Sequence, residues 1–438
     1  MEWSRYSRLF LSRRNGWLLY NAATNSFLQL EDPQAEDVRA IMAAPDGFDF
    51  SRCPQLYILL RAGGYLVDPG RDDAVFNILK MRRLSQRYAN DSLLVTVAIT
   101  RACNFDCSYC YEANRTGQPM TEEVAEKLVD FIRKFKVQHR HITWYGGEPL
   151  LAFPRIRQIH GRLKELGIDY LASLITNGYL LEEPVIRELG ELGIRFIQIT
   201  LDGSQKTHDS RRFLKGGGAT FDRILGNLDK LMASGYDGSV SIRVNVDGRN
   251  AEEFMEVHRL IASRYSDAFG ERICVYPGFV HGDSHPDAGC FFDSDKKGNF
   301  IAQVAEKHGV KALSLFPRMP SASCTLTKQN AFVVGPEGEL YKCWNDVGIP
   351  SQVVGSIESL TGWNLPLIAQ GMVAASYLDA EECRECFYFP ICDGGCHKIR
   401  MENLQEGKRS DVCSYFKHHL EELLELHYEQ KDMQSGAR

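Results

Sequence analysis

The sequence predicts an α/β fold, in which a partial (β/α)6 barrel lies between a small N-terminal module and an irregular, cysteine-rich C-terminal segment. Three observations predict this fold. Strand and helix patterns alternate strictly from residue 92 to about residue 310, most cysteines fall into two groups, and few periodic segments follow residue 311. Because repeated strand-then-helix units form parallel sheets with helices outside, we expect domains at residues 1–88, 89–310 and 311–438.

Composition limits the class of protein. The 438 residues suit two or three domains, and 44% hydrophobic with 25% charged residues is typical of a soluble globular protein. The net charge of −6 provides no strong basic field, which disfavours nucleic-acid binding. The sequence contains neither a signal peptide nor an apolar stretch of about 18 residues. We therefore expect a cytoplasmic protein that binds neither nucleic acid nor membranes.

The N-terminal module combines short strands with helices. Residues 7–30 alternate as strands, with breaks at Asn15-Gly16 and at residues 21–25. Helices are expected over residues 33–43 and 56–67, the second of which leads into a short strand around residues 64–67. This pattern predicts a winged-helix-like module. The alternative is a scaffold extension that packs on the main domain.

The barrel region contains six strands, each followed by a helix. The expected strands are 93–100, 141–145, 171–176, 195–201, 239–245 and 272–280. The expected helices are 122–137, 154–166, 183–192, 221–233, 252–265 and 299–307. Catalytic loops are then expected at the C-terminal ends of the strands. The segment after residue 311 has little core of its own, so metal ligation is expected to stabilise it, and residues 411–429 predict a closing amphipathic helix.

Thirteen cysteines in a chain expected in the cytosol indicate metal or catalytic sites rather than disulfides. Cys103, Cys107 and Cys110 follow the first barrel strand with C-x3-C-x2-C spacing. Thiolates are soft ligands that suit iron–sulfur clusters and zinc. Three of them leave one iron of a four-iron cluster open. A zinc site with a fourth ligand elsewhere is the alternative.

These residues resemble the radical S-adenosylmethionine (SAM) superfamily, whose signature is C-x3-C-x-aromatic-C. Tyr109 fills the aromatic position, and Gly146, Gly147 and Glu148 stand where the family carries its GGEP segment. The resemblance implies a TIM-like radical SAM barrel in which this segment holds the amino group of SAM. Glycine allows close backbone approach, and a carboxylate suits an ammonium group.

Further resemblances follow at the next strand ends. Asn177 follows the third strand, and Thr200 ends the fourth, where relatives often carry serine in Ser-Leu-Asp-Gly followed by His-Asp-x-x-Arg. The resemblance implies that Thr200 and Arg212 help to hold the ribose or carboxylate of SAM, with the adjacent Arg211 as the alternative. Arg243 ends the fifth strand and is expected to line the same cavity.

Seven further cysteines resemble the SPASM domain of radical SAM enzymes in order and spacing. They are Cys324, Cys343, Cys383, Cys386, Cys392, Cys396 and Cys413. The resemblance implies two auxiliary [4Fe-4S] clusters and therefore three clusters in all, besides SAM. Cys383, Cys386, Cys392 and Cys413 would hold the outer one. Cys324, Cys343 and Cys396 would hold the inner one, with either Cys290 as fourth ligand or an open iron.

The resemblance also implies the reaction. The cluster donates an electron to SAM, and the resulting 5′-deoxyadenosyl radical abstracts hydrogen from an unactivated C–H bond. We expect a maturase of ribosomally made peptides (a RiPP maturase) that forms a thioether or C–C cross-link. The N-terminal module is expected to bind the leader of the precursor peptide, and a flavodoxin or ferredoxin to supply electrons.

Two alternatives remain open. One is an anaerobic sulfatase-maturing enzyme that makes formylglycine. Such enzymes usually carry Asp directly after the G-x4-C cysteine, where this chain has Trp344, and they usually begin near the cluster motif. The other is a non-catalytic iron–sulfur electron carrier, which the presence of Glu148 and the other SAM-side residues disfavours.

Overall fold

The computed structural model describes residues 1–112, 117–280, 292–308, 314–320 and 324–435. The chain forms two compact units. The barrel unit consists of residues 88–292 and 324–374, and the terminal unit consists of residues 1–87, 293–323 and 375–438. Compactness therefore groups the chain differently from the three consecutive segments expected from sequence. The division of the chain into three functional domains stays a prediction.

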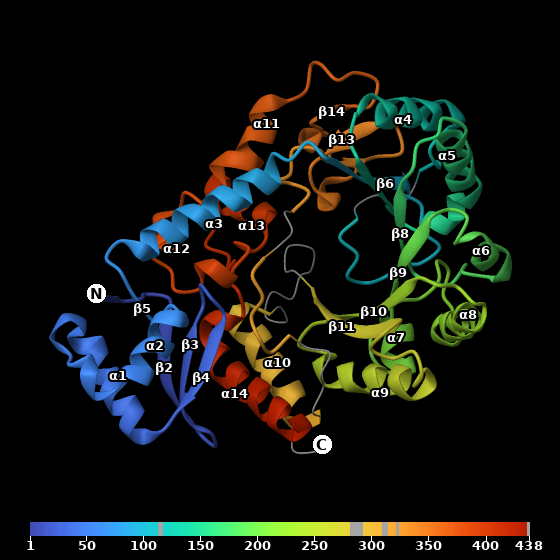
Figure 1. Cartoon of the computed structure of the whole chain (residues 1–438). Coiled ribbons are helices and arrows are strands. Elements are labelled where there is room, and N and C mark those ends of the chain that lie inside the picture. Colours follow the sequence, from blue (N-terminus) through green and yellow to red (C-terminus); the bar gives the residue numbers. More distant parts are fainter. Residues whose placement is uncertain (113–116, 281–291, 309–313, 321–323, 436–438) are drawn as a thin grey trace. The chain divides into compact units, whose positions relative to one another are not determined.

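The barrel unit is built on a nine-stranded sheet, ordered β11-β10-β9-β8-β7-β6-β12-β13-β14. Six strands run parallel: β6 (Ser92–Thr100), β7 (His139–Gly146), β8 (Leu171–Thr176), β9 (Ile194–Thr200), β10 (Ser239–Val246) and β11 (Ile273–Phe279). Figure 1 shows helices along the outer side of this curved sheet: α4 (Glu122–Lys134), α5 (Phe153–Glu165), α6 (Glu183–Glu188), α8 (Phe221–Ala233) and α9 (Phe254–Arg264). This confirms the α/β class with a mostly parallel central sheet.

Local sequence explains why these elements form where they do. In β6, a nearly continuous apolar run is buried on both faces, as expected of a parallel strand. In α4, the side chain of Thr121 accepts a hydrogen bond from Val124 N at the helix start, and Arg133 and Lys134 stand in the last turn. The short helix α7 (Gln205–Arg211) was not expected from sequence.

Three strands of the barrel sheet come from the segment after residue 311, which was predicted to be irregular. They are β12 (Ala331–Val334), β13 (Glu339–Tyr341) and β14 (Gly355–Ser356). β12 pairs parallel with β6, and β13 pairs antiparallel with β12. Strands this short have no readable periodicity, so only pairing with an existing sheet edge reveals them. Helix α11 (Leu365–Ala369) follows them in the barrel unit.

The terminal unit begins with the three-stranded antiparallel sheet β2 (Ser7–Ser12), β3 (Gly16–Asn21) and β4 (Ser26–Leu30). Strand β1 (Glu2–Trp3) pairs with β5 (Leu66–Val67). Helices α1 (Asp32–Ala43) and α2 (Pro54–Ala62) pack with these strands through Leu19, Val38, Ile41 and Leu60. The second expected helix is thus shorter than predicted and ends before Gly63. Small strands with helices are present, and the winged-helix assignment stays a prediction.

Helix α3 (Arg71–Arg87) was not expected from sequence. It buries Phe76 and Leu79 against Tyr377 and Phe389 of the C-terminal segment. Arg83 is also buried there: its Nη2 donates to the carbonyl oxygens of Phe389 (2.7 Å) and Pro390 (3.2 Å). Because part of its buried face is arginine, the helix lacks a plain apolar pattern in the sequence.

The remaining helices of the terminal unit are α10 (Ser294–His308), α12 (Glu381–Arg384), α13 (His397–Glu406) and α14 (Phe416–Ser435). α10 and α14 lie side by side (Figure 1), and a Cβ at Gly298 would come within 2.3 Å of the His419 ring. The closing helix starts at Phe416, later than expected. Among the described helices, none is both long enough and apolar enough to cross a membrane.

Candidate active site

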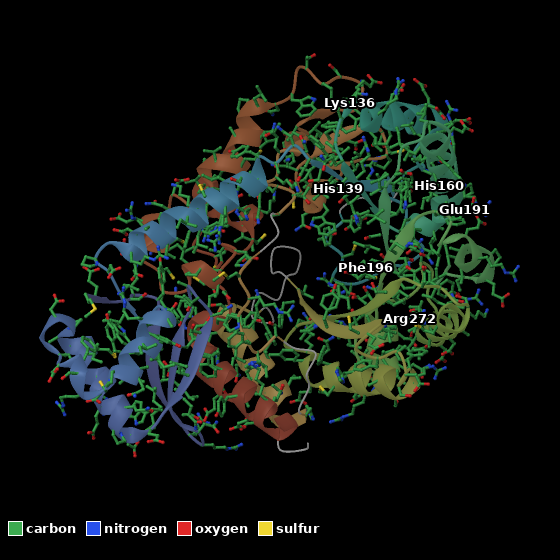
Figure 2. The ribbon with its side chains drawn as sticks, viewed as in Figure 1. Lys136, His139, His160, Glu191, Phe196 and Arg272 are labelled. Carbon is green, nitrogen blue, oxygen red and sulfur yellow. The ribbon has the colours of Figure 1, made fainter. Side chains whose placement is uncertain are left out.

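The cysteine loop follows β6 and is held in shape by backbone hydrogen bonds to residues 211–215. Asp106 N donates to Phe213 O (2.9 Å), and Ser108 N donates to Arg211 O (3.1 Å). Phe105 N donates to Cys103 Sγ at 3.4 Å. Burial, followed by the charge of Glu148, raises the pKa of Cys103 to about 12. The loop lies at the C-terminal ends of the parallel strands. Figure 2 labels two residues at the other, N-terminal ends: His139, which begins β7, and Arg272, which directly precedes β11.

The loop has the donor set that a four-iron cluster requires. Cys103, Cys107 and Cys110 lie in this loop and are not joined in disulfides. In the described ranges, no three His, Cys, Asp or Glu side chains are grouped as ligands of a single metal ion. Thiolates of a four-iron cluster bind different irons, so they lie farther apart than the ligands of one ion. Two buried donors beside the loop, Asn104 Nδ2 and Arg212 Nε, have no hydrogen-bond partner in the described structure. Such donors fit an anionic group.

Gly146 and Gly147 lie against the backbone at the end of β6. A Cβ at Gly146, whose φ is +128°, would stand 2.2 Å from Thr100 O, and one at Gly147 would stand 2.3 Å from Ala102 O. Glu148 N donates to the same Ala102 O at 2.9 Å. The two glycines are therefore required for the close approach of β7 to the cysteine loop.

Glu148 is fully buried, and its carboxylate is bound by its own chain. Oε1 accepts from Leu150 N (3.0 Å) and Thr176 Oγ1 (2.7 Å), and Oε2 accepts from Asn177 N (2.8 Å). Burial raises the pKa of Glu148, and these hydrogen bonds oppose that shift. Glu148 thus ties the end of β7 to the end of β8, and Oε2 keeps one lone pair for a further donor.

Asn177 joins the same network to the cysteine loop. Its Nδ2 donates to Asn104 Oδ1 (2.7 Å) and lies 3.9 Å from Cys103 Sγ, while its Oδ1 accepts from Tyr179 N (3.0 Å). The structure therefore brings Asn177, Glu148 and Cys103 together.

Tyr109 connects the cysteine loop to the ends of β9 and β10. Its hydroxyl accepts from Arg212 Nη1 (2.6 Å) and from Asn245 Nδ2 (3.0 Å). Burial raises the pKa of Tyr109 well above the usual value, the charge of Arg212 opposes that shift, and the charge of Asp202 adds to it. The aromatic position of the motif thus anchors the loop by its hydroxyl as well as its ring. Sequence spacing gave no signal for Asp202 and Asn245 as its partners.

Arg211 and Arg212 have different surroundings. Arg211 Nη1 lies 2.9 Å from Asp247 Oδ2, and its Nε lies 3.6 Å from Asp202 Oδ2, so two carboxylates neutralise it. Arg212 bonds to the Tyr109 hydroxyl and keeps its buried Nε without a partner in the described structure. The buried Nε of Arg211 likewise has no hydrogen-bond partner in the described structure, but it faces the Asp202 carboxylate at 3.6 Å, so Arg212 is the one of the pair whose free donor has no carboxylate beside it. Thr200 is buried at the end of β9, beside Arg243 in register.

His208 has a fixed neutral form behind this site. Its Nδ1 accepts from Asp202 N (3.1 Å), and its Nε2 donates to Thr220 Oγ1 (3.1 Å), because that hydroxyl donates to Arg212 O (2.6 Å). Burial, followed by the charges of Arg212 and Arg211, lowers the pKa of His208 well below 6.5. A proton on Nδ1 would oppose the Asp202 N–H.

We expect this histidine to make the protein less stable in acid. Below pH 6.5 the imidazole of His208 takes up a proton in the unfolded chain but not in the folded chain. The free energy of unfolding therefore decreases as the pH drops below 6.5. The expected loss from His208 is up to about 1.4 kcal/mol per pH unit. Urea unfolding of the anaerobic apoprotein at pH 7 and pH 5.5 measures it. His208→Asn should flatten the dependence, whereas the exposed His139→Asn should not. Equal slopes in all three proteins would refute the prediction.

Five of the later cysteines lie in the terminal unit. Three of them accept hydrogen bonds at sulfur: Cys392 from Gly394 N (3.3 Å), Cys383 from Arg400 Nη2 (3.8 Å) and Cys413 from Lys417 Nζ (3.4 Å). The charges of Cys386 and Cys383 act on Cys392, and those of Cys413 and Cys386 act on Lys417. The structure thus brings the expected outer set together. Cys396 directly precedes α13 in the same unit.

Cys324 and Cys343 belong to the barrel unit. Between them, the buried Lys342 donates from Nζ to Ala331 O (2.6 Å) and Lys328 O (2.6 Å). Burial lowers the pKa of Lys342 to about 7, and the charge of Cys324 opposes that shift. A buried amine that interacts with the charge of Cys324 fits an anionic group, which would favour its protonated form. The expected inner set is therefore divided between two units, and Cys290 lies outside the described residues.

Comparison with known proteins defines the class. The family model described as the radical SAM superfamily matches residues 97–261. This range contains the cysteine loop, the glycine edge and strands β7 to β10. The chain therefore carries a radical SAM domain and is a radical SAM enzyme. SAM and the iron–sulfur cluster of that superfamily are its implied cofactors.

Its relatives include maturases of two kinds. The cysteine-type anaerobic sulfatase-maturating enzyme of Clostridium perfringens is 23% identical over 336 residues, which cover 70% of this chain and 89% of that protein. The sporulation killing factor maturation protein SkfB of Bacillus subtilis is 31% identical over 170 residues, which cover 37% of this chain and 38% of that protein.

Two solved structures share the fold. Native anSMEcpe with bound AdoMet has a TM-score of 0.61 at 18% identity, covering 79% of this chain and 100% of that one. Streptococcus suis SuiB bound to precursor peptide SuiA has a TM-score of 0.52 at 14% identity, covering 95% of this chain and 99% of that one. At these identities, the likeness concerns the fold.

Proposed function

We propose that this enzyme matures a ribosomally made precursor peptide and forms a thioether or C–C cross-link in it. One observation carries the choice of substrate: the likeness to SuiB covers 95% of the chain, whereas the likeness to anSMEcpe covers 79%. SuiB is described as bound to a precursor peptide. This wider coverage supports a fold shared over more of the chain with a relative described as bound to a peptide.

In this proposal, Cys103, Cys107 and Cys110 hold the cluster that binds SAM. When bound, SAM and the cluster supply a 5′-deoxyadenosyl radical that abstracts hydrogen from an unactivated C–H bond. The chain's own residues orient SAM and exclude water. Around the loop, Tyr109 and Asn177 fix its position, and the glycine edge allows β7 to approach it closely. Gly146, Gly147, Glu148, Thr200 and Arg212 complete the proposed SAM-binding set.

We also propose two auxiliary [4Fe-4S] clusters in a C-terminal SPASM domain. The electrostatic interactions of Cys383 and Cys386 with Cys392, and of Cys386 and Cys413 with Lys417, support the outer one. The buried Lys342 amine, which interacts with Cys324, supports the inner one, to which Cys343 and Cys396 would contribute. Donors at the sulfur atoms and cations nearby stabilise such anionic clusters.

The N-terminal module is proposed to bind the leader of the precursor peptide, added as a strand at an edge of the β2–β3–β4 sheet. A flavodoxin or ferredoxin in the cytoplasm is proposed as the electron donor. Truncation tests of the module should end before Arg71, because α3 packs against Tyr377 and Phe389 beside the outer cysteines. Removing residues 1–88 would therefore disturb a cluster as well as peptide binding.

Sulfatase maturation is the second candidate, supported by the Clostridium perfringens relative that covers 70% of this chain. The residue after the G-x4-C cysteine disfavours it. Trp344 stands there, 41% exposed and with its ring 5.5 Å from that of Tyr145. An indole has no proton-accepting group that could serve as a base.

The decisive assay uses the reconstituted enzyme, SAM and dithionite with either a leader-bearing precursor peptide or a sulfatase peptide. We expect 5′-deoxyadenosine in both cases, and loss of two hydrogen atoms from the precursor peptide alone, measured by mass spectrometry. Formylglycine in the sulfatase peptide would instead establish the second candidate.

A further inference from the structure

Arg243 is a half-buried arginine on the inner face of the barrel sheet. Its neighbours in β10, Ile242 and Val244, are fully buried, and successive side chains of a strand point to opposite faces. Its Nε donates to Asn245 Oδ1 at 2.7 Å, and it lies opposite Tyr276 of β11 in register. In the part of the chain that the structure describes, no carboxylate is paired with Arg243.

Arg243 shares the barrel interior with the cysteine loop. Burial raises the pKa of Tyr145 on β7, the charge of Cys110 adds to that shift, and the charge of Arg243 opposes it. Because β8 and β9 separate β7 from β10 in the sheet, Tyr145 and Arg243 can interact only across the interior. The guanidinium therefore faces the same space as the thiols of the radical SAM loop.

Gly278 makes room for this guanidinium. A Cβ at position 278 of β11 would lie 2.3 Å from Arg243 Nε and 2.6 Å from its Cζ. The side chain thus lies across the glycine, held in one place by the neighbouring strand. A fixed, planar guanidinium is suited to bidentate binding of a carboxylate.

We infer that Arg243 binds a carboxylate of the peptide substrate inside the barrel, either an Asp or Glu side chain or the C-terminal carboxylate. This inference rests on the proposed peptide substrate. A half-buried cation with only neutral oxygen partners gains a counter-charge from such a ligand. Arg211, by contrast, already has Asp202 and Asp247.

Binding of short probe peptides to the reconstituted enzyme with SAM tests the inference. The probes are Ac-Gly-Ala-Asp-Ala-Gly-NH2, its Asn counterpart, and Ac-Gly-Ala-Gly with either a free or an amidated C-terminus. We expect one carboxylate probe to bind about tenfold tighter than its neutral partner by titration NMR. Which pair shows the preference identifies the source of the carboxylate.

Three variants locate the effect. Arg243→Gln should abolish the preference, and Gly278→Ala should reduce it by displacing the guanidinium. Arg187→Gln, at an exposed arginine paired with Glu183, should retain it. Equal binding of acidic and neutral probes to the wild type, or a preference that survives Arg243→Gln, would overturn the inference.

Measurements on SAM distinguish a role of Arg243 in binding the peptide from a role in binding SAM. If Arg243→Gln weakens SAM binding or the formation of 5′-deoxyadenosine without peptide, Arg243 serves SAM and the inference is wrong. If the wild type forms no 5′-deoxyadenosine at all, the proposed function fails instead. The binding preference is measured without turnover, so the two failures are separate.

Discussion

Replacement of Cys103, Cys107 and Cys110 by alanine is expected to abolish formation of 5′-deoxyadenosine completely. These three thiols are the only cysteines in the loop that the Tyr109 and Asn177 contacts fix beside Glu148. Without them, no open iron is available at the end of β6. We also expect the variant to lose about a third of its iron, because two of three four-iron clusters would remain.

The control is Cys274→Ala, in the same unit. Cys274 lies in β11 with its Sγ 3.3 Å from Ser241 Oγ, away from the loop end of that strand. Its replacement should change neither the iron content nor SAM cleavage. Wild-type levels of 5′-deoxyadenosine from the triple variant would exclude the loop as the reactive site. Loss of all iron would show that the later cysteines hold no cluster of their own.

The barrel strands could be predicted because buried parallel strands consist of consecutive apolar residues, which are recognisable in the sequence. β6 and β8 start within one residue of the expected positions, and helix α8 matches its expected bounds. Elements that depend on partners far along the chain could not be predicted. Helix α3 buries Arg83 by giving it carbonyl acceptors at Phe389 and Pro390, about 300 residues away.

In the candidate site, too, some residues could be predicted from local sequence and others depend on distant partners. Cysteines and glycines could be assigned from motifs, since cluster ligation and close backbone approach each demand particular residue types. The network around them could not. Asp202 and Asn245 meet Tyr109 only because the ends of β9 and β10 adjoin the cysteine loop. That Cys324 and Cys343 belong to one compact unit and Cys396 to the other is likewise a property of the fold.

Glu148→Ala is expected to destabilise the barrel unit by several kcal/mol and to abolish SAM binding. The substitution leaves Leu150 N, Asn177 N and Thr176 Oγ1 buried without their acceptor. Each unsatisfied buried group costs about 1–3 kcal/mol. Chemical unfolding of the apoprotein and equilibrium binding of SAM to the reconstituted enzyme measure the two effects.

Two further variants separate the structural role of Glu148 from a role in binding SAM. Thr176→Val removes one hydrogen bond to the carboxylate and the acceptor of Gly178 N but keeps the charge of Glu148, so we expect a loss of about 2–3 kcal/mol in stability and normal SAM affinity. Glu148→Gln keeps Oε1 as an acceptor for Leu150 N and Thr176 Oγ1 but places an amide donor opposite Asn177 N. If the remaining lone pair of Oε2 accepts the ammonium of SAM, Glu148→Gln should weaken SAM binding more than its stability loss explains. Normal SAM affinity in Glu148→Gln would show instead that Glu148 acts only by joining β7 to β8.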